Sequence, residues 1–227
     1  MDQLLVLCPS RGRPEKAAEA HAAFGRMSSG RFSEMLFVVD LDDPAIEKYR
    51  ESVPVFSASP SQRRGMTDPL NEAVALYWDQ FEVIGFVGDD HRFKTPAWDQ
   101  IFLQHLELVG GGLAYGNDLN RQDGDIPTQI FGSAKIWKAL GWMALPAARH
   151  LYLDNAWKVI GESVERLYYF PQVVIEHVHP AFGKAEWDDQ YRELNAPGLY
   201  SEDGAAFSQW LESGQAEQDI ARVRAVL

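Results

Sequence analysis

Residues 82–91 read Glu82-Val83-Ile84-Gly85-Phe86-Val87-Gly88-Asp89-Asp90-His91, and this stretch is the most informative in the chain. Its first half is a short apolar run typical of a buried strand, and it stops at a glycine followed by two acids. Open α/β sheets bind ligands at the carboxyl ends of their strands, where Asp89 and Asp90 would lie. Two adjacent carboxylates repel each other unless a cation or a hydrogen-bond donor lies between them. We therefore expect a divalent metal, Mg²⁺ or Mn²⁺, carrying a phosphate here, with an ordinary acidic turn as the alternative.

The composition is that of a globular protein without a broadly basic surface. The chain has 227 residues, of which 46% are hydrophobic and 24% charged, and its formal net charge is −12. This length fits one α/β domain, and this charge argues against broad binding of nucleic-acid phosphates while allowing a local basic pocket. The single cysteine, Cys8, lies in an apolar run and suits a reducing compartment. Because no run reaches transmembrane length and no leader pattern opens the chain, we expect a cytoplasmic protein without membrane contact.

Strands and helices alternate ahead of the central stretch. The expected elements are, in order, a strand over 4–8, a helix over 15–26, a strand over 35–39, a helix near 45–50, a strand over 53–56 and a helix over 69–80. Pro54 favours a sheet edge for the third strand, because proline cannot donate a ladder hydrogen bond. This alternation predicts an α/β fold with a mostly parallel central sheet flanked by helices.

Polar residues follow the first two of these strands. The loop Pro9-Ser10-Arg11-Gly12-Arg13 leads into a helix, and Arg11 and Arg13 lie where a helix amino terminus favours anions. Asp40 ends the second strand and could hydrogen-bond a ribose or a base. The alternatives are a solvated basic turn in the first loop and a helix cap in the second. Another basic pair, Arg63-Arg64, lies in a polar loop before the helix over 69–80.

The second half of the chain is less periodic and richer in aromatic residues. We expect one domain over residues 1–227, with a nucleotide-binding half over 1–112, an acceptor-binding half over 113–190 and a helical tail over 191–227. The tail is polar, so it would pack at the periphery or self-associate, which leaves a homo-oligomer open.

Two groups of residues in the second half carry candidate chemistry. Asp154 lies at the start of a helix over 155–161, where a carboxylate could cap the helix or deprotonate an incoming hydroxyl. A strand over 173–179 would place His177 and His179 on one face. Two imidazoles at a strand end, followed by Lys184, indicate a metal ligand and a cation for a diphosphate.

In their order along the chain, these residues resemble the glycosyltransferase A fold, the family of nucleotide-sugar-dependent transferases, over residues 3–190. The positions that carry the resemblance are Pro9, Ser10, Arg11, Arg13, Asp40, Asn71, the motif Gly88-Asp89-Asp90, Asp154, Asn155, His177, His179, Pro180 and Lys184. The resemblance implies Mn²⁺ or Mg²⁺ on Asp90 and on His177 or His179. It further implies Asp154 as the acceptor-activating base and Asp89 against the ribose or the donor sugar. The loop Pro9 to Arg13, Asp40, Asn71 and Lys184 would hold the nucleoside and its diphosphate.

The activity that the resemblance implies is metal-dependent transfer of a sugar from a nucleoside-diphosphate sugar to a hydroxyl acceptor, by inversion. A protein, a glycan, a small molecule and a modified nucleobase all remain open as the acceptor. Gly88 departs from the family pattern, since a full Asp-x-Asp motif would have an acid there. The alternatives are a non-catalytic nucleotide-sugar or glycan-binding module and a sugar-phosphate nucleotidyltransferase. The small size also resembles that of bacteriophage enzymes, which would place the protein in the host cytoplasm.

Overall fold

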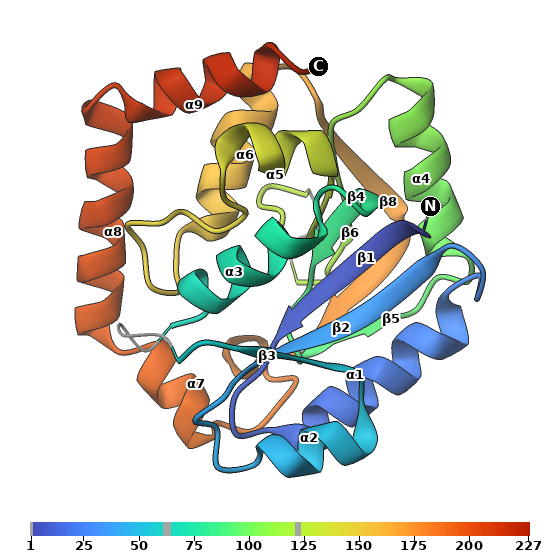
Figure 1. Cartoon of the computed structure of the whole chain (residues 1–227). Coiled ribbons are helices and arrows are strands. Elements are labelled where there is room, and N and C mark those ends of the chain that lie inside the picture. The colour runs from blue at the N-terminus through green and yellow to red at the C-terminus, as the bar shows by residue number, and fades with distance from the viewer. Residues whose placement is uncertain (1, 61–64, 121–123) are drawn as a thin grey trace.

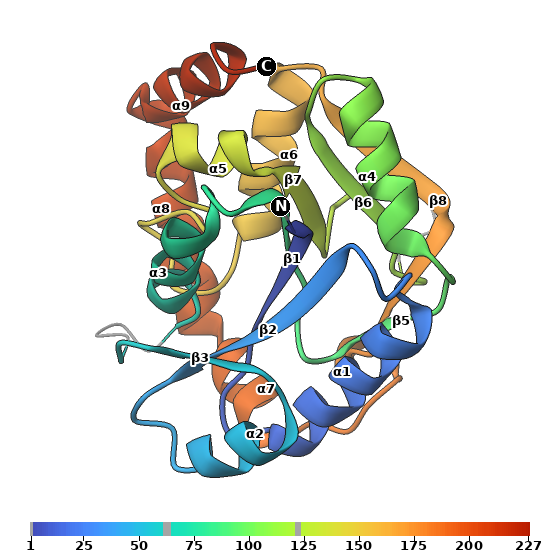
Figure 2. The same cartoon turned by 45° about the vertical axis from the view of Figure 1, so that its right-hand side comes forward.

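The computed structural model describes residues 2–60, 65–120 and 124–227, so Arg63 and Arg64 lie outside the described residues. Within these ranges the strands form one eight-stranded sheet in the order β3-β2-β1-β4-β7-β6-β8-β5. Figure 1 labels all of these strands except β7, which is labelled in Figure 2. The strands are β1 (Asp2–Pro9), β2 (Ser33–Asp40), β3 (Val55–Ala58), β4 (Phe81–Phe86), β5 (His91–Phe93), β6 (Leu113–Asn117), β7 (Ile130–Ser133) and β8 (Leu167–His177). Strands β3, β2, β1 and β4 are mutually parallel, as are β6 and β8, whereas β7 and β5 run antiparallel to their neighbours. The predicted mostly parallel α/β sheet is therefore confirmed.

The first half of the sheet is buried on both faces, as its continuous apolar runs predict. Along β1, Leu5 and Leu7 pack into the core on one face, whereas Leu4 and Val6 pack into the core on the other. Cys8 is fully buried with the second group. Because β1, β2 and β4 are parallel, their carboxyl ends meet at one edge of the sheet, which brings the polar loops that follow them together.

Helices cover both faces of the sheet (Figure 2). They are α1 (Pro14–Met27), α2 (Ile46–Ser52), α3 (Thr67–Tyr77), α4 (Trp98–Leu108), α5 (Ala134–Leu140), α6 (Leu153–Ser163), the 3₁₀ helix η1 (Pro180–Phe182), α7 (Asp189–Leu194), α8 (Pro197–Glu212) and α9 (Gln215–Arg224). Side chains of α1 and α4 fill the core on one face, and side chains of α3, α5 and α6 fill the core on the other. Helix α9 packs against α5 and α6. In the described residues, no helix combines the length and the apolar character needed to cross a bilayer.

The largest corrections to the predicted elements lie near the late histidines. The strand predicted over 173–179 starts earlier, at Leu167, and stops at His177. It cannot continue in the same way because Pro180 begins η1, and the side chain of His179 caps that turn by accepting from Ala181 N. Strand β5, three residues long, was not predicted. Strand β3 lies at the sheet edge as predicted, and it begins after Pro54.

Candidate functional site

Asp89 lies at the carboxyl end of β4, beside the loop that follows β1. It is buried, with 1% of its surface exposed. Ser10 Oγ donates a hydrogen bond of 2.6 Å to Asp89 Oδ2, and Arg13 Nη2 lies 3.0 Å from Asp89 Oδ1. Tyr49 supports this loop from α2, since its hydroxyl accepts from Arg13 N at 2.7 Å and lies 2.8 Å from Ser10 Oγ. The structure thus brings the predicted residues Ser10, Arg13 and Asp89 together.

Asp90 faces two histidines that strand pairing brings together. Strands β5 and β8 pair so that His91 lies opposite His177, and the two rings stack with centroids 4.4 Å apart. His177 Nε2 lies 3.2 Å from Asp90 Oδ2. His91 Nδ1 accepts a hydrogen bond from Gly88 N at 3.0 Å and lies 3.3 Å from Asp90 Oδ1. Sequence reasoning missed His91, although it follows the aspartate motif directly, because its partner strand lies 86 positions later in the chain (177 − 91 = 86).

These residues fit a divalent metal. Candidate ligand atoms of Asp90, His91 and His177 all lie within 4.8 Å of one another. Two ligands about 2.1 Å from one octahedral ion lie about 3 Å apart, which is close to the 3.2 Å between Asp90 Oδ2 and His177 Nε2. Carboxylate and imidazole together suit Mn²⁺ and similar ions. His179 lies beside this group, with its ring 5.1 Å from that of His177, but its Nδ1 accepts from Ala181 N.

The charges of the two carboxylates differ because their partners differ. Burial raises the pKa of Asp89 to about 6, with Arg13 acting in the opposite direction. Burial also acts to raise the pKa of Asp90, but His177 and His91 outweigh it and hold that pKa well below its usual value. Burial lowers the pKa of His91, whereas Asp90 raises that of His177 above its usual value despite burial. Asp90 therefore stays ionised to lower pH than Asp89 does, which suits a metal ligand.

Helix α7 closes over this group from the far end of the chain. Tyr191 Oη donates a hydrogen bond of 2.9 Å to Asp90 Oδ2. Its ring lies under two cations, with Arg13 4.8 Å and Lys16 4.2 Å from the ring centroid. Lys16 Nζ also binds Asp188, the residue that caps α7, at 2.7 Å. No sequence pattern pointed to Tyr191, because a tyrosine on a short helix looks like an ordinary packing residue.

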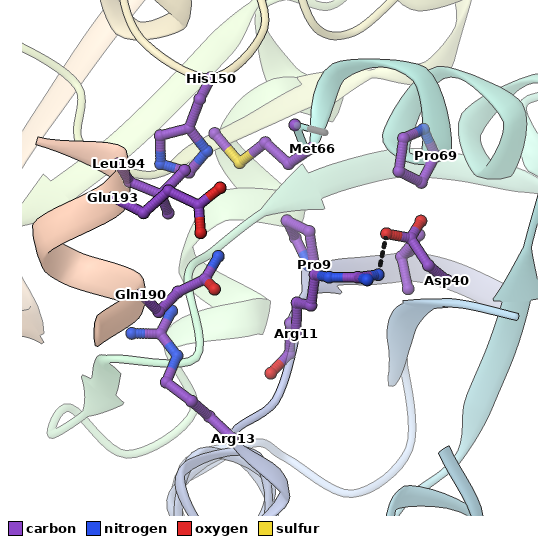
Figure 3. Close-up of a pocket in the computed structure, with 13 residues that line it drawn as sticks. Pro9, Arg11, Arg13, Asp40, Met66, Pro69, His150, Gln190, Glu193 and Leu194 are labelled. Atoms are coloured by element: carbon purple, nitrogen blue, oxygen red, sulfur yellow. Dashed lines mark hydrogen bonds and ion pairs between the residues drawn. The ribbon is translucent and has the colours of Figure 1, made fainter. Parts of the chain in front are cut away.

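Two cavities adjoin at these strand ends. The first, of about 320 Å³, lies at the ends of β1 and β2, and we call it the β1–β2 cavity (Figure 3). The second, of about 350 Å³, is lined by Asp90 and His177, and we call it the His177 cavity. Residues of the β1–β2 cavity include Pro9, Ser10, Arg11, Asp40, Gln190 and Glu193; those of the His177 cavity include Asp89, Tyr152, Asp154, Trp157, His179 and Phe182. Arg13 and His150 line both, so a ligand could extend from one cavity into the other.

The predicted nucleoside residues Arg11 and Asp40 lie together in the β1–β2 cavity. Arg11 Nη1 donates to Asp40 Oδ2 at 2.8 Å and to Asp42 Oδ1 at 2.7 Å. Burial raises the pKa of Asp40, and Arg11 acts against it. Asp154 lies in the first turn of α6, where its Oδ1 accepts from Asn155 N at 2.9 Å. It shares the His177 cavity with Asp90.

Two predicted residues lie outside both cavities. Asn71 Oδ1 accepts from the backbone N–H groups of Met143 and Ala144, each at 2.9 Å, and its Nδ2 donates to Ala144 O. The amide therefore ties α3 to the loop before α6. Lys184 Nζ lies 3.2 Å from Glu176 Oε1 and 3.4 Å from Leu119 O. Neither side chain lines the β1–β2 cavity or the His177 cavity.

Comparisons with known proteins find similarity in structure alone. No protein-family model matches the chain, and no curated protein matches its sequence. Among solved structures, S. aureus TarS (residues 1–349) in complex with UDP-GlcNAc has a TM-score of 0.58 at 13% identity, over 93% of this chain and 72% of that chain. A mannosyltransferase from Pyrobaculum calidifontis, in complex with GDP-Man and Mn²⁺, has a TM-score of 0.59 at 12% identity, over 99% and 80%.

A third similar structure is glucosyl-3-phosphoglycerate synthase from Mycobacterium tuberculosis, in complex with Mn²⁺, UDP and phosphoglyceric acid. Its TM-score is 0.57 at 12% identity, over 91% of this chain and 77% of that chain. Identities this low support the fold and leave the activity open. The sheet order, the helical layers and these three likenesses show that this chain has the glycosyltransferase A fold.

Proposed function

We propose that this protein transfers a sugar from a nucleoside-diphosphate sugar to a hydroxyl acceptor with the help of a divalent metal. The observation that carries the proposal is the Asp90–His177 pair, 3.2 Å apart, in the wall of a cavity that adjoins the polar β1–β2 cavity. In a glycosyltransferase A fold, this arrangement provides neighbouring places for a nucleoside, a metal-bound diphosphate and an acceptor. Donors of this class are bound in the TarS and mannosyltransferase structures.

Asp90 and His177 would hold Mn²⁺ or Mg²⁺, with His91 next to them. The metal would offset the charge that develops on the departing nucleoside diphosphate. Arg13 adds a cation beside it: its Nε and Nη1 are buried and have no hydrogen-bond partner among the described residues. A guanidinium with uncommitted donors is suited to phosphate oxygens. Arg13 would therefore take the role beside the diphosphate that the sequence assigned to Lys184, because Arg13 lines both cavities and Lys184 lines neither.

Asp154 is our candidate for the acceptor-activating base. It lines the His177 cavity from α6, together with Tyr152 and Trp157. A carboxylate here would take the proton from the acceptor hydroxyl as that oxygen attacks the anomeric carbon. If the acceptor oxygen attacks from the side opposite the diphosphate, the configuration at that carbon inverts. The identity of the acceptor, the cytoplasmic location and the bacteriophage origin stay predictions from the sequence.

Thermal unfolding with nucleoside diphosphates and Mn²⁺ tests the proposal. A ligand at one hundred times its dissociation constant stabilises a fold by about 2.7 kcal/mol, which is a visible shift in Tm. We expect such a shift with Mn²⁺ and its loss on addition of EDTA. Asp90→Asn should lose the Mn²⁺-dependent part of the shift, because a neutral amide is a poor ligand for a hard cation.

Asp79→Asn is the matched control, since Asp79 is exposed and far from the site in the turn before β4. It should behave as the unaltered protein does. If no nucleotide shifts Tm with any metal, the proposal is wrong. Binding without donor turnover would instead support a non-catalytic module.

A further inference from the structure

The β1–β2 cavity has two polar walls that face each other (Figure 3). One wall is the Arg11–Asp40 pair at the strand ends. The other is α7, from which Gln190 and Glu193 point into the cavity. Helix α7 is fixed in this place by two contacts already described, Tyr191 with Asp90 and Asp188 with Lys16.

Several acceptor atoms in this cavity have no hydrogen-bond donor among the described residues. Asp40 Oδ1 is buried and has no hydrogen-bond partner in the described part of the chain. The carboxylate of Glu193 makes no hydrogen bond or ion pair with any described residue, and the amide of Gln190 likewise makes none. An ionised carboxylate can only accept hydrogen bonds, so a ligand with several N–H or O–H donors fits this cavity best. Arg11, which lies beside Asp40, is a donor and could bind one acceptor atom of the same ligand.

Building on the proposed function, we propose that α7 reads the base of the donor and that Glu193, assisted by Gln190, selects guanine. The pairing edge of guanine carries a ring N–H and a 2-amino group next to the O6 acceptor. These donors match the carboxylates of Asp40 and Glu193, and O6 matches Arg11 or the Gln190 amide. Hydrogen bonds between N–H groups and carboxylates are charge-assisted and therefore strong.

The other bases fit this set of groups less well. Uracil has one ring N–H between two carbonyl oxygens, so one of its carbonyls would face a carboxylate. Cytosine and adenine each have a single amino group on this edge, and the ring nitrogen beside it is an acceptor. Each of them leaves a carboxylate without a donor, which costs binding free energy.

Direct binding measurements test this assignment without any acceptor. Calorimetry with Mn²⁺ and GDP, IDP, UDP, CDP or ADP gives the base preference of the unaltered protein. We expect GDP to bind tightest, and IDP, which lacks the 2-amino group, to bind at least about tenfold more weakly. Glu193→Ala should weaken GDP by at least about tenfold while leaving UDP unchanged. Glu193 is exposed, so this variant should fold normally.

Glu186→Ala is the matched control, since Glu186 is an exposed acid that precedes α7 and lies outside the cavity. It should leave all five affinities unchanged. Equal losses for every nucleotide in Glu193→Ala would overturn the inference, because Glu193 would then contact the ribose. Tighter binding of UDP than GDP by the unaltered protein would also overturn it and would leave the proposed function standing. Failure of every nucleotide to bind would reject both.

Discussion

Asp154 and Asp90 are two carboxylates in one cavity with different expected tasks. Asp90 is surrounded by partners that keep it ionised, namely His177, His91 and Tyr191. Asp154 lies at the cavity wall on a separate helix, where its Oδ1 accepts from the next backbone N–H. A residue that activates the acceptor acts in the transition state and contributes little to donor binding. The two roles can therefore be separated by experiment.

We expect Asp154→Asn to bind nucleoside diphosphate and Mn²⁺ with unchanged affinity and to lose transfer by about 10²–10⁴-fold, the usual contribution of a general base. Release of nucleoside diphosphate in the presence of an acceptor found by screening measures the transfer. Glu162→Gln, which removes an exposed carboxylate from the same helix, should retain it. Full transfer by Asp154→Asn would remove Asp154 from the mechanism.

The sequence predicted candidate site residues where a buried strand is followed directly by polar residues. Ser10, Asp40, Asp89 and Asp90 all lie at such ends, and the structure places each of them beside a cavity. Their partners were not predictable. Nothing in the sequence says that Arg13 pairs with Asp89 while Tyr191 bonds Asp90, because 76 and 101 positions separate the members of these pairs (89 − 13 = 76; 191 − 90 = 101).

At the scale of elements, α7 is the helix that links the two cavities. It places Tyr191 on Asp90 in the His177 cavity and Gln190 and Glu193 in the β1–β2 cavity. The phenol of Tyr191 donates to the same oxygen, Asp90 Oδ2, that lies nearest His177. A metal on that oxygen would compete with the phenol for its lone pairs.

Tyr191→Phe should therefore lower the unfolding free energy of the metal-free protein and increase the further stabilisation that Mn²⁺ gives. Loss of a hydrogen bond to a charged group should lower the metal-free stability by about 1.5–3 kcal/mol. The stabilisation produced by saturating Mn²⁺ should grow, because the metal no longer displaces the phenol. Urea unfolding with and without Mn²⁺ measures both changes. Tyr168→Phe is the control, since Tyr168 lines neither cavity and its hydroxyl also bonds a charged residue, Arg166. A smaller Mn²⁺ effect in Tyr191→Phe would contradict this account.

Long, regular elements were predicted better than short ones. The central parts of β1, β2 and β4 are continuous apolar runs, so their burial in a parallel sheet follows from sequence alone. Strand β5 is only three residues long and exists because β8 pairs with it. Strand β8 contains Pro171 and shifts register where it passes β6, so the sequence does not show that the segments before and after Pro171 form one strand. Strands β5 and β8 depend on pairing between segments that are far apart in the chain. Local sequence patterns do not predict such pairing.

At the scale of the whole molecule, the tail adds a few side chains to the core. Trp210, Ala216 and Val223 are buried within the same core as α3, α5 and α6, whereas most other residues of α8 and α9 stay at the periphery, where we expected the tail. The polar composition of α8 and α9 concealed this, since only a narrow stripe of each helix faces inward. The tail also reaches the site, because Asp203 of α8 is buried and binds the loop that carries His150.

Asp203 should therefore affect both stability and ligand binding. Its carboxylate accepts from the backbone N–H groups of Arg149, His150 and Leu151 at 2.8, 2.9 and 2.7 Å. Asp203→Asn places an amide N–H against one of these donors, so we expect a loss of about 2–4 kcal/mol in unfolding free energy. Because His150 lines both cavities, nucleotide affinity should fall in the same variant, measured at a temperature where it stays folded.

Glu202→Gln separates this effect from a general change of charge on α8. Glu202 is the neighbouring acid, and its exposed ion pair with Arg149 at 3.0 Å should contribute no more than about 1 kcal/mol. If Asp203→Asn and Glu202→Gln have the same unfolding free energy and the same nucleotide affinity, the tail does not position the site. If Asp203→Asn loses affinity as well as stability, α8 holds His150 at the junction of the two cavities, and the site depends on nearly the full length of the described chain.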